Sequence, residues 1–253
     1  LPNYLYRNGV DVVWRSTNWG EPPLHIEHTY NLAALKERYP EANGDYDGIL
    51  LEGLKEEIEA CEAPKVLIVL HTSTSHGPEY YAKYPKEFAK FTPVCTTVEM
   101  AKADRAELIN AYDNSILYTD YILSSLIQTI DQPNTVSALM FVSDHGENIS
   151  QGGAGHGGDC APIKQEYHVP FIFWWSEEYA EQYSTKIQCA IQNKKAKING
   201  DNIYYSVCDL ADIQLAEQYN KTSWSVLSLD FEEHERLILV PDGKTCIHVD
   251  NLE

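Results

Sequence analysis

The sequence predicts an α/β protein: a mostly parallel β-sheet with helices on both faces, and a small antiparallel addition at the C-terminal end. Short, nearly continuous apolar runs are typical of strands that are covered on both faces. Segments with apolar residues at helical spacing lie between these runs, and alternating strands and helices favour parallel pairing. With 253 residues and 43% hydrophobic content, the chain can bury a substantial core, and we expect one main domain.

Four apolar runs predict the strands of this sheet. They are DVVW (11–14), KVLIVLH (65–71), SALMFVSD (137–144) and VPFIFWW (169–175). Between the first two, residues 15–47 contain scattered Gly, Pro, Asn and Asp, which predicts a long surface excursion.

Helices are predicted over residues 48–60, 105–130 and 201–218, the last with Asp201 or Asn202 near its N-cap. In the second of these helices, one face is expected to carry Leu108, Tyr112, Ile116, Leu123, Leu126 and Ile130. The tail, residues 223–250, has a turn signal at Pro241 to Gly243 and predicts the antiparallel addition.

The charge of the chain excludes some partners. A formal net charge of -19 disfavours binding to nucleic acid or to an anionic membrane surface, but it suits a bound cation. The sequence contains no run of about 18 consecutive apolar residues, so no membrane-spanning helix is expected within residues 1–253. The first residues, LPNYLYRN, have neither an initiator Met nor the features of a signal peptide, so we expect a processed chain or an excised piece.

The six cysteines lack CxxC or zinc-knuckle spacing, so a structural zinc site is not expected. Their even number permits up to three disulfides. Their positions alone leave both the pairing and the redox compartment open.

The segment SDHGENISQGGAGHGG (143–158) is the strongest candidate for a functional loop. In an extended strand Asp144 and His145 would point to opposite faces, so they can share a ligand only where the strand breaks, at Gly146. Carboxylate and imidazole groups are common zinc ligands, and the following glycines allow His156 to fold back to the same place. The alternative is a surface loop in which Asp144 caps a helix and the histidines face water.

His76 favours the functional interpretation. It lies in HTSTSHGPEYY, beyond the strand that ends at His71, and ligands of such sheets gather at the carboxyl ends of the strands. Two loops that carry histidines are therefore expected at one edge, which predicts a metal or phosphate site. His71 itself is expected to be bonded within the fold.

Two polar groups near this site have open roles. Glu147 is expected either to orient a ligand histidine or to be an acidic residue in the first turn of a helix. The run Ser73 to Ser75 is expected to be a hydroxyl-rich turn, with donation to phosphate oxygens as the alternative.

Long motifs resemble one known family. HTSTSHGPEYYAKYPKEFAKFTPVC, INAYDNSILYTDYIL and FVSDHGEN followed by GHG are similar to the catalytic domain of the phosphoethanolamine transferases that modify lipid A, which include the mobile colistin-resistance enzymes. These enzymes belong to the alkaline phosphatase and sulfatase superfamily. The resemblance runs from VVWR (12–15) to HVPFIFWW (168–175) in the family's order, whereas the tail matches only loosely.

The resemblance implies a sulfatase-like α/β catalytic domain in the periplasm, anchored to the inner membrane by an N-terminal transmembrane domain that residues 1–253 lack. The family's zinc is bound by a Glu, a nucleophilic Thr, an Asp and a His, and the last two match Asp144 and His145. His76 and His156 match histidines that contact the transferred phosphoethanolamine or a further zinc ion. A periplasmic location also favours disulfides over free thiols.

The chain departs from the family pattern in three places. The Glu ligand and the Thr nucleophile normally precede VVWR and are not assigned here, so we expect the chain alone to be inactive. A Lys that some members carry after the WR motif has no counterpart in STNWGEPP. The usual short-range cysteine partner of Cys95 is also missing.

The function that the resemblance implies is transfer of phosphoethanolamine from phosphatidylethanolamine to lipid A or another envelope acceptor, through a phospho-Thr intermediate. One alternative keeps the superfamily but changes the reaction to that of a phosphodiesterase, sulfatase or phosphoglycerol transferase. The other is a non-catalytic binding module.

Overall fold

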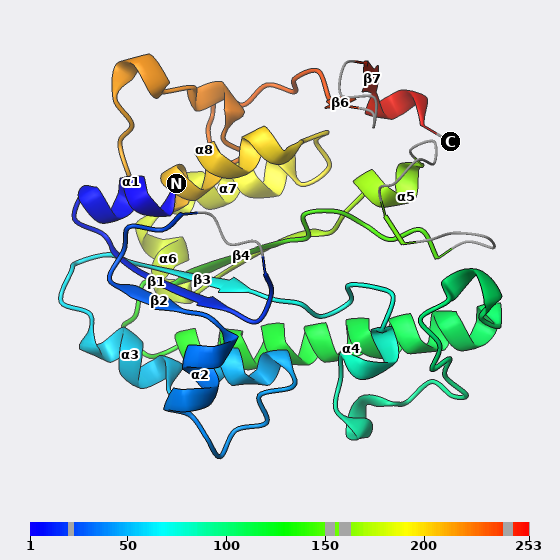
Figure 1. The fold of residues 1–253 in the computed structure, drawn as a ribbon. Coiled ribbons are helices and arrows are strands. Elements are labelled where there is room, and N and C mark those ends of the chain that lie inside the picture. The colour runs from blue at the N-terminus through cyan, green and yellow to red at the C-terminus, as the bar shows by residue number, and fades with distance from the viewer. Residues whose placement is uncertain (20–22, 150–154, 157–162, 240–244, 253) are drawn as a thin grey trace. The chain divides into compact units, whose positions relative to one another are not determined.

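The computed structural model describes residues 1–19, 23–149, 155–156, 163–239 and 245–252 (Figure 1). The chain divides into two compact units. Unit 1 comprises Leu1–Thr129 and Ile149–Gly155, and unit 2 comprises Ile130–Asn148 and His156–Glu253.

Unit 1 contains a parallel sheet. Its helices and strands are α1 (Pro2–Arg7), β1 (Asp11–Ser16), β2 (His28–Tyr30), α2 (Leu32–Arg38), the 3-10 turn η1 (Asp47–Leu51), α3 (Leu54–Ala60), β3 (Val66–His71) and α4 (Arg105–Ile130), whose last residue belongs to unit 2. The strand order is β2-β1-β3, and β1 pairs in parallel with both neighbours. Figure 1 shows α2 and α3 on one side of this sheet. The two predicted strands of this region and their parallel pairing are therefore confirmed.

Two predictions about unit 1 need correction. Residues 15–47 are more than a surface excursion, because they contain β2 and also α2, whose N-cap residue Asn31 accepts a hydrogen bond from the amide of Ala34 at 3.0 Å. The predicted helix 48–60 is divided into η1 and α3 at Gly53, which has φ of +58°. A Cβ atom at Gly53 would lie 2.5 Å from the Tyr39 hydroxyl, so the break needs glycine both for its backbone angle and for its size.

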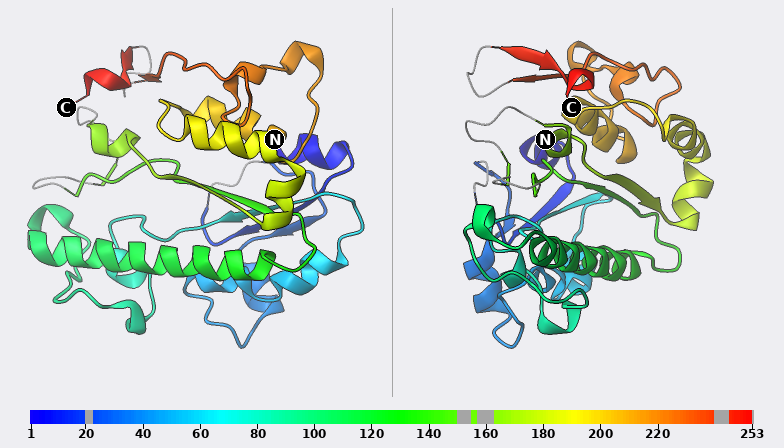
Figure 2. Two further views of the ribbon diagram at one scale, coloured as in Figure 1. Left: turned by 180° about the vertical axis from the view of Figure 1, so that it is seen from behind. Right: turned by 90° about the vertical axis from the view of Figure 1, so that its right-hand side faces the viewer.

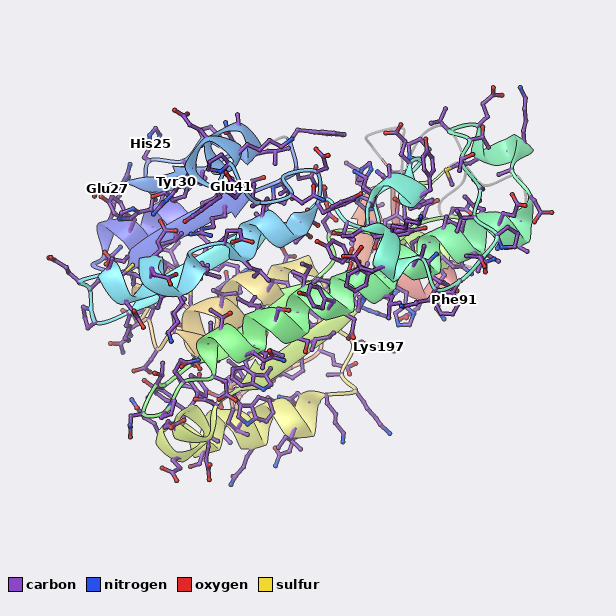
Figure 3. The ribbon with its side chains drawn as sticks, turned by 90° about the horizontal axis from the view of Figure 1, so that it is seen from below. His25, Glu27, Tyr30, Glu41, Phe91 and Lys197 are labelled. Atoms are coloured by element: carbon purple, nitrogen blue, oxygen red, sulfur yellow. The ribbon has the colours of Figure 1, made fainter. Side chains whose placement is uncertain are left out.

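A buried ion pair joins β1 to α3. Arg15 is fully buried; its Nε donates to the Glu57 carboxylate at 3.0 Å, and its Nη1 donates to the carbonyls of Leu50 and Glu52. Burial opposes the charged form of Glu57, but the hydrogen bond and charge of Arg15, with help from Tyr30 and Arg38, hold the pKa of Glu57 below its ordinary value (Tyr30 is labelled in Figure 3). The pair fixes α3 against the sheet.

The long helix α4 has the predicted bounds, but the face that it buries differs from the predicted one. The stripe predicted from the spacing includes Ile116, which is 43% exposed. The buried residues are Leu108, Ala111, Asn114, Ser115, Tyr118 and Ile122. Small side chains at 111 and 115 allow close packing, and Leu108 and Ala111 form a cluster with Tyr80. Neighbouring loops, and not apolar spacing alone, decided which face is buried.

Unit 2 pairs its strands in antiparallel fashion. Its elements are β4 (Ala138–Val142), α5 (Lys164–Tyr167), β5 (Phe171–Trp175), α6 (Glu177–Gln182), α7 (Ser184–Asn193), α8 (Gly200–Leu210), β6 (Leu237–Leu239) and β7 (Cys246–His248) (Figure 2). Both apolar runs are strands as predicted, but β4 and β5 are antiparallel, so the parallel pairing expected for them is wrong. In the described part of their connection only the one-turn helix α5 occurs, whereas a parallel pair needs a longer crossover.

The C-terminal part of unit 2 follows the prediction in outline. β6 and β7 form the expected antiparallel pair, while the predicted turn at Pro241 to Gly243 lies outside the described residues. Helix α8 has Asn199 as its N-cap in a capping box and ends at Leu210, before the predicted residue 218. Asp212, with φ of +52°, turns the chain away there.

The described cysteines are free. Cys61, Cys95, Cys189, Cys208 and Cys246 form no disulfide, and Cys160 lies outside the described residues. For these five residues the disulfides favoured by the resemblance are thus not found. Burial raises the pKa of the Cys208 thiol to about 11. Among the described helices none has the length and apolar character needed to cross a membrane.

Candidate active site

The loop that follows β3 in unit 1 is anchored by the buried carboxylate of Asp47. This carboxylate accepts hydrogen bonds from the amides of Ser73 and Thr74, at 3.1 and 2.8 Å, and from the hydroxyls of Thr17, Ser73 and Thr74. Asp47 itself is 2% exposed. The hydroxyl-rich turn predicted at this position is confirmed, because Ser73 and Thr74 are bound to Asp47.

His71 and His76 have different roles in this loop. Nδ1 of His71 lies 3.1 Å from the Ser16 hydroxyl at the end of β1, so His71 is bonded within the fold as predicted. Nδ1 of His76 lies 2.7 Å from the carbonyl oxygen of Gly77. Because a carbonyl only accepts, Nδ1 of His76 carries the proton, and Nε2 is the nitrogen with the lone pair when the ring is neutral.

The strand break predicted at Gly146 is present in unit 2. The amide of Gly146 donates to the carbonyl of Glu166 at 2.7 Å. A Cβ atom at Gly146 would lie 2.0 Å from the carbonyl oxygen of Gln165, so only glycine allows this close approach of the two backbones. The loop after β4 is held in place by this contact.

Asp144 and His145 are adjacent to this break. Nδ1 of His145 lies 3.0 Å from the Gly146 carbonyl, which leaves Nε2 as the lone-pair nitrogen of the neutral ring. This Nε2 atom is 3.8 Å from the Asp144 carboxylate, and the Asp144 side chain is 82% exposed. Two ligand atoms that are each about 2.0 Å from a tetrahedral zinc ion lie about 3.3 Å apart. Asp144 and His145 therefore fit one divalent ion after a small adjustment.

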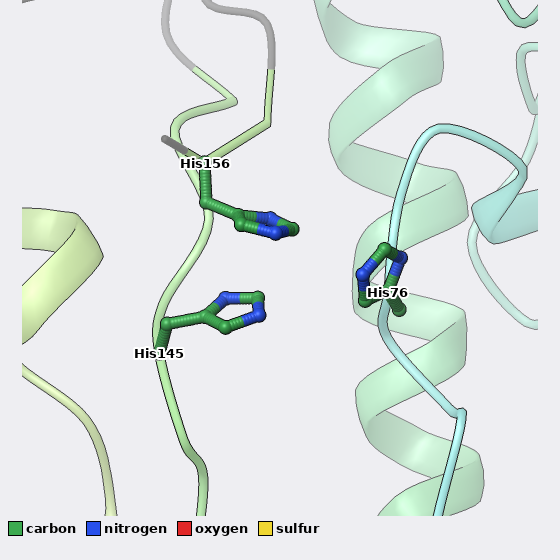
Figure 4. Close-up of side chains that lie close together, drawn as sticks. All are labelled: His76, His145 and His156. Atoms are coloured by element: carbon green, nitrogen blue, oxygen red, sulfur yellow. The ribbon is translucent and has the colours of Figure 1, made fainter. Parts of the chain in front are cut away.

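His156 stacks on His145 and is oriented by Glu147. The two imidazole centroids are 3.6 Å apart with an interplanar angle of 28°, and Figure 4 shows the rings face to face. Nδ1 of His156 lies 3.3 Å from the carboxylate of Glu147, whose side chain is 4% exposed. Glu147 is outside any helix, so of its two predicted roles the structure supports orientation of a histidine.

The predicted site residues are distributed over both units. Unit 2 brings Asp144, His145 and His156 together, whereas His76 belongs to unit 1. That His76 acts with the other three stays a prediction. The other glycines that were expected to fold the loop back, apart from Gly155, lie outside the described residues.

Sequence reasoning missed Asp47. It was read as the end of a surface excursion, and a lone acidic residue before an apolar run gives no local signal of burial. The only hint was the clustering of Ser and Thr after β3, since such hydroxyl and amide donors need an acceptor when they are buried.

Comparison with known proteins identifies the family. A sulfatase family model matches residues 1–213. The phosphoethanolamine transferase EptA of Salmonella typhimurium is 34% identical over 224 residues, which cover 85% of this chain and 40% of that protein. The chain spans about two-fifths of the length of the first curated relatives that it matches.

Solved structures agree with this relationship. The C-terminal periplasmic domain of the phosphoethanolamine transferase EptC from Campylobacter jejuni has a TM-score of 0.76 and 32% identity, covering 91% of this chain and 71% of that one. The corresponding domain of EptC from Escherichia coli, solved in complex with Zn, has a TM-score of 0.76 and 23% identity, covering 99% of this chain and 71% of that one. The chain therefore belongs to the sulfatase family, and its relatives within that family are phosphoethanolamine transferases.

Proposed function

We propose that this chain is the catalytic domain of a zinc-dependent enzyme that transfers phosphoethanolamine from phosphatidylethanolamine to lipid A or another envelope acceptor. The observation that carries the proposal is the ligand pair Asp144 and His145, 3.8 Å apart, beside a second histidine that a buried carboxylate orients. The transferred group, phosphoethanolamine, is proposed from the names of the relatives.

The donor set of unit 2 fits zinc. A carboxylate and a neutral imidazole are ordinary zinc ligands, and zinc ligand histidines characteristically donate their other ring nitrogen to an oxygen, as His145 does to the Gly146 carbonyl. A bound zinc ion would neutralise charge on the phosphoryl group and lower the pKa of a coordinated hydroxyl. The similar E. coli domain was solved with Zn, which supports the same choice of metal here.

The histidines are proposed to act on the transferred group. His156, held by Glu147, would donate to a phosphoryl oxygen and offset the charge that develops there. His76 is proposed to join it from the loop that Asp47 anchors in unit 1. The reaction is proposed to pass through a phospho-Thr intermediate, with diacylglycerol leaving first and an acceptor phosphate then displacing the Thr oxygen. No residue of this chain is assigned as that Thr.

The location of the reaction is proposed to be the periplasm, at the inner membrane. The matched part of the C. jejuni relative is its periplasmic domain, and both the lipid donor and the lipid acceptor are held in a bilayer. We also propose that the domain is attached to this membrane by an N-terminal transmembrane domain.

The decisive experiment uses the whole transferase of which this chain is proposed to be the catalytic domain. It compares lipid A from cells that express this protein with lipid A from cells that do not, by mass spectrometry. The expected result is a new species heavier by one phosphoethanolamine group. Asp144→Asn and His145→Ala should remove this species, a loss of about a thousandfold in rate, because the metal supplies several kcal/mol of transition-state stabilisation. Zinc content measured by elemental analysis should fall in parallel.

The matched control is Asp45→Asn. The Asp45 side chain is 79% exposed and makes a surface pair with Lys36, so both activity and zinc content should stay unchanged. Normal activity in the Asp144→Asn variant, or an unmodified lipid A in cells with the wild-type protein, would refute the proposal.

A further inference from the structure

A large aromatic side chain in unit 1 takes no part in the packing of the core. Trp19, in the turn after β1, is 73% exposed. An exposed indole offers a large, flat face to a ligand.

The backbone at Trp19 is fixed by hydrogen bonds that link the ends of two strands. The Trp19 amide donates to the Asn18 side-chain oxygen at 2.9 Å, and the Asn18 side-chain nitrogen donates to the Thr72 carbonyl at 3.1 Å. The Asn18 amide donates to the Ser16 hydroxyl at 3.2 Å. The turn is therefore attached to the segment after β3, and the backbone of Trp19 is tied to the ends of β1 and β3.

The indole lies beside His76 within the same unit. The two ring centroids are 6.0 Å apart, with an interplanar angle of 69°. A nearly perpendicular contact of this kind covers only a small part of the indole, in agreement with its high exposure. Because Asp47 holds Thr17 as well as Ser73 and Thr74, the segments that carry Trp19 and His76 are bound to one buried carboxylate.

The chemistry of an exposed indole in a strongly acidic protein suits an organic cation. The face of a Trp ring is the strongest aromatic binder of ammonium groups. Phosphoethanolamine carries a phosphate that needs donors such as His76 and, two carbons away, a primary ammonium group. The net charge of -19 attracts the cationic end of this group and opposes uptake of a purely anionic one.

We infer that Trp19 is the residue that recognises the ammonium group of the transferred phosphoethanolamine, through a cation–π contact beside His76. Trp19 thereby selects the ethanolamine headgroup over headgroups without a cation. This inference rests on the proposed function, since it specifies which end of the same substrate Trp19 binds.

The test uses two soluble probes of similar shape, O-phosphoethanolamine and propyl phosphate, which has a methyl group in place of the ammonium. Their affinities for the zinc-loaded chain are measured by calorimetry. The wild-type chain should prefer phosphoethanolamine by about fivefold, as expected for a partly exposed cation–π contact. Trp19→Leu should remove most of this preference without weakening propyl phosphate binding, and leave only what the net charge of the chain contributes, whereas Trp19→Phe should keep a larger part of it.

Phe91→Leu is the matched control, because Phe91 is another exposed aromatic residue of unit 1, 45% exposed and labelled in Figure 3. This variant should keep the full preference. An unchanged preference in Trp19→Leu would overturn the role of Trp19 while leaving the phosphate site intact. Failure of the wild-type chain to bind either probe would overturn the proposed function together with this inference.

A parallel measurement separates headgroup recognition from contact with a lipid surface. Turnover is measured with the whole transferase of which this chain is proposed to be the catalytic domain. If Trp19→Leu keeps its preference for phosphoethanolamine but loses turnover on phosphatidylethanolamine vesicles, Trp19 binds the bilayer and the inference is wrong. Equal loss of turnover and of probe preference would support it.

Discussion

Two buried carboxylates, Asp47 in unit 1 and Glu147 in unit 2, organise the loops that follow β3 and β4 in different ways. Asp47 binds backbone amides and hydroxyls, so it fixes the path of its loop. Glu147 binds the ring of His156, so it fixes a side chain, while the path of its loop is set by the contact of Gly146 with Glu166. The difference teaches that a buried carboxylate can organise a loop through its backbone, as Asp47 does, or can orient one side chain of it, as Glu147 does.

Removal of the Asp47 carboxylate is expected to have the largest effect. Asp47→Ala leaves the partly buried amides of Ser73 and Thr74 without their acceptor, which should lower the free energy of unfolding by about 3 kcal/mol. Urea denaturation measures this change. Asp45→Ala, two residues away and exposed, is the control and should stay close to wild type. Equal stabilities of the two variants would contradict the anchoring role of Asp47.

Gly146→Ala tests how the second loop is held. The new Cβ atom would lie 2.0 Å from the Gln165 carbonyl oxygen, so the two backbones must separate at a cost of about 2 kcal/mol in the free energy of unfolding. Gly200→Ala, where a Cβ atom has no heavy atom within 4 Å, is the control and should be neutral or stabilising in α8. A wild-type melting temperature for Gly146→Ala would show that the contact is not tight.

Glu147→Gln should separate the two carboxylates by function. Loss of the charge that orients His156 should reduce zinc affinity or transfer activity by about 10- to 100-fold. Because the Gly146 amide holds this loop at the Glu166 carbonyl, the melting temperature should change much less than in Asp47→Ala. Zinc titration measures the zinc affinity and lipid A mass spectrometry the transfer activity, and calorimetry measures the melting temperature. If Glu147→Gln unfolds the protein while zinc binding per folded molecule is unchanged, the proposed difference between Asp47 and Glu147 is wrong.

The smallest expected effect is a loss of folding stability at alkaline pH, when Tyr118 loses its proton. The side chain of Tyr118 supports η1 next to Asp47. Its hydroxyl accepts a hydrogen bond from the Gly48 amide at 2.9 Å, and burial raises the pKa of Tyr118 to about 12. The unfolded chain loses this proton near pH 10 and the folded chain only near pH 12, so stability is full below pH 10 and falls as the pH rises. The loss at pH 11 is about 1.4 kcal/mol.

Tyr118→Phe should be less stable at neutral pH by about 1 kcal/mol, since the Gly48 amide loses its acceptor. The fall in stability between pH 10 and 12 should be shallower in this variant, as measured by urea denaturation at several pH values. An identical pH dependence would assign the fall to other groups.

The sequence by itself determined the main elements and the strand break next to the candidate site. Apolar runs located β1, β3, β4 and β5 because a strand covered on both faces must be apolar along its whole length. Gly146, next to Asp144 and His145, indicated the strand break because glycine has the backbone freedom that such a break uses. These signals are local, and local physics suffices to read them.

Only the tertiary structure decided the direction of β5, the buried face of α4 and the partners of the two carboxylates. Each depends on groups far apart in the chain: Met140 with Phe173, Ala111 with Tyr80, Asp47 with Thr74. Apolar spacing shows that a face will be buried, but what buries it depends on which loops return to it. In the sequence, Asp47 and Glu147 are both acidic residues without a local signal of burial. Their burial, and the hydrogen-bond donors that compensate for it, are created only when the chain folds.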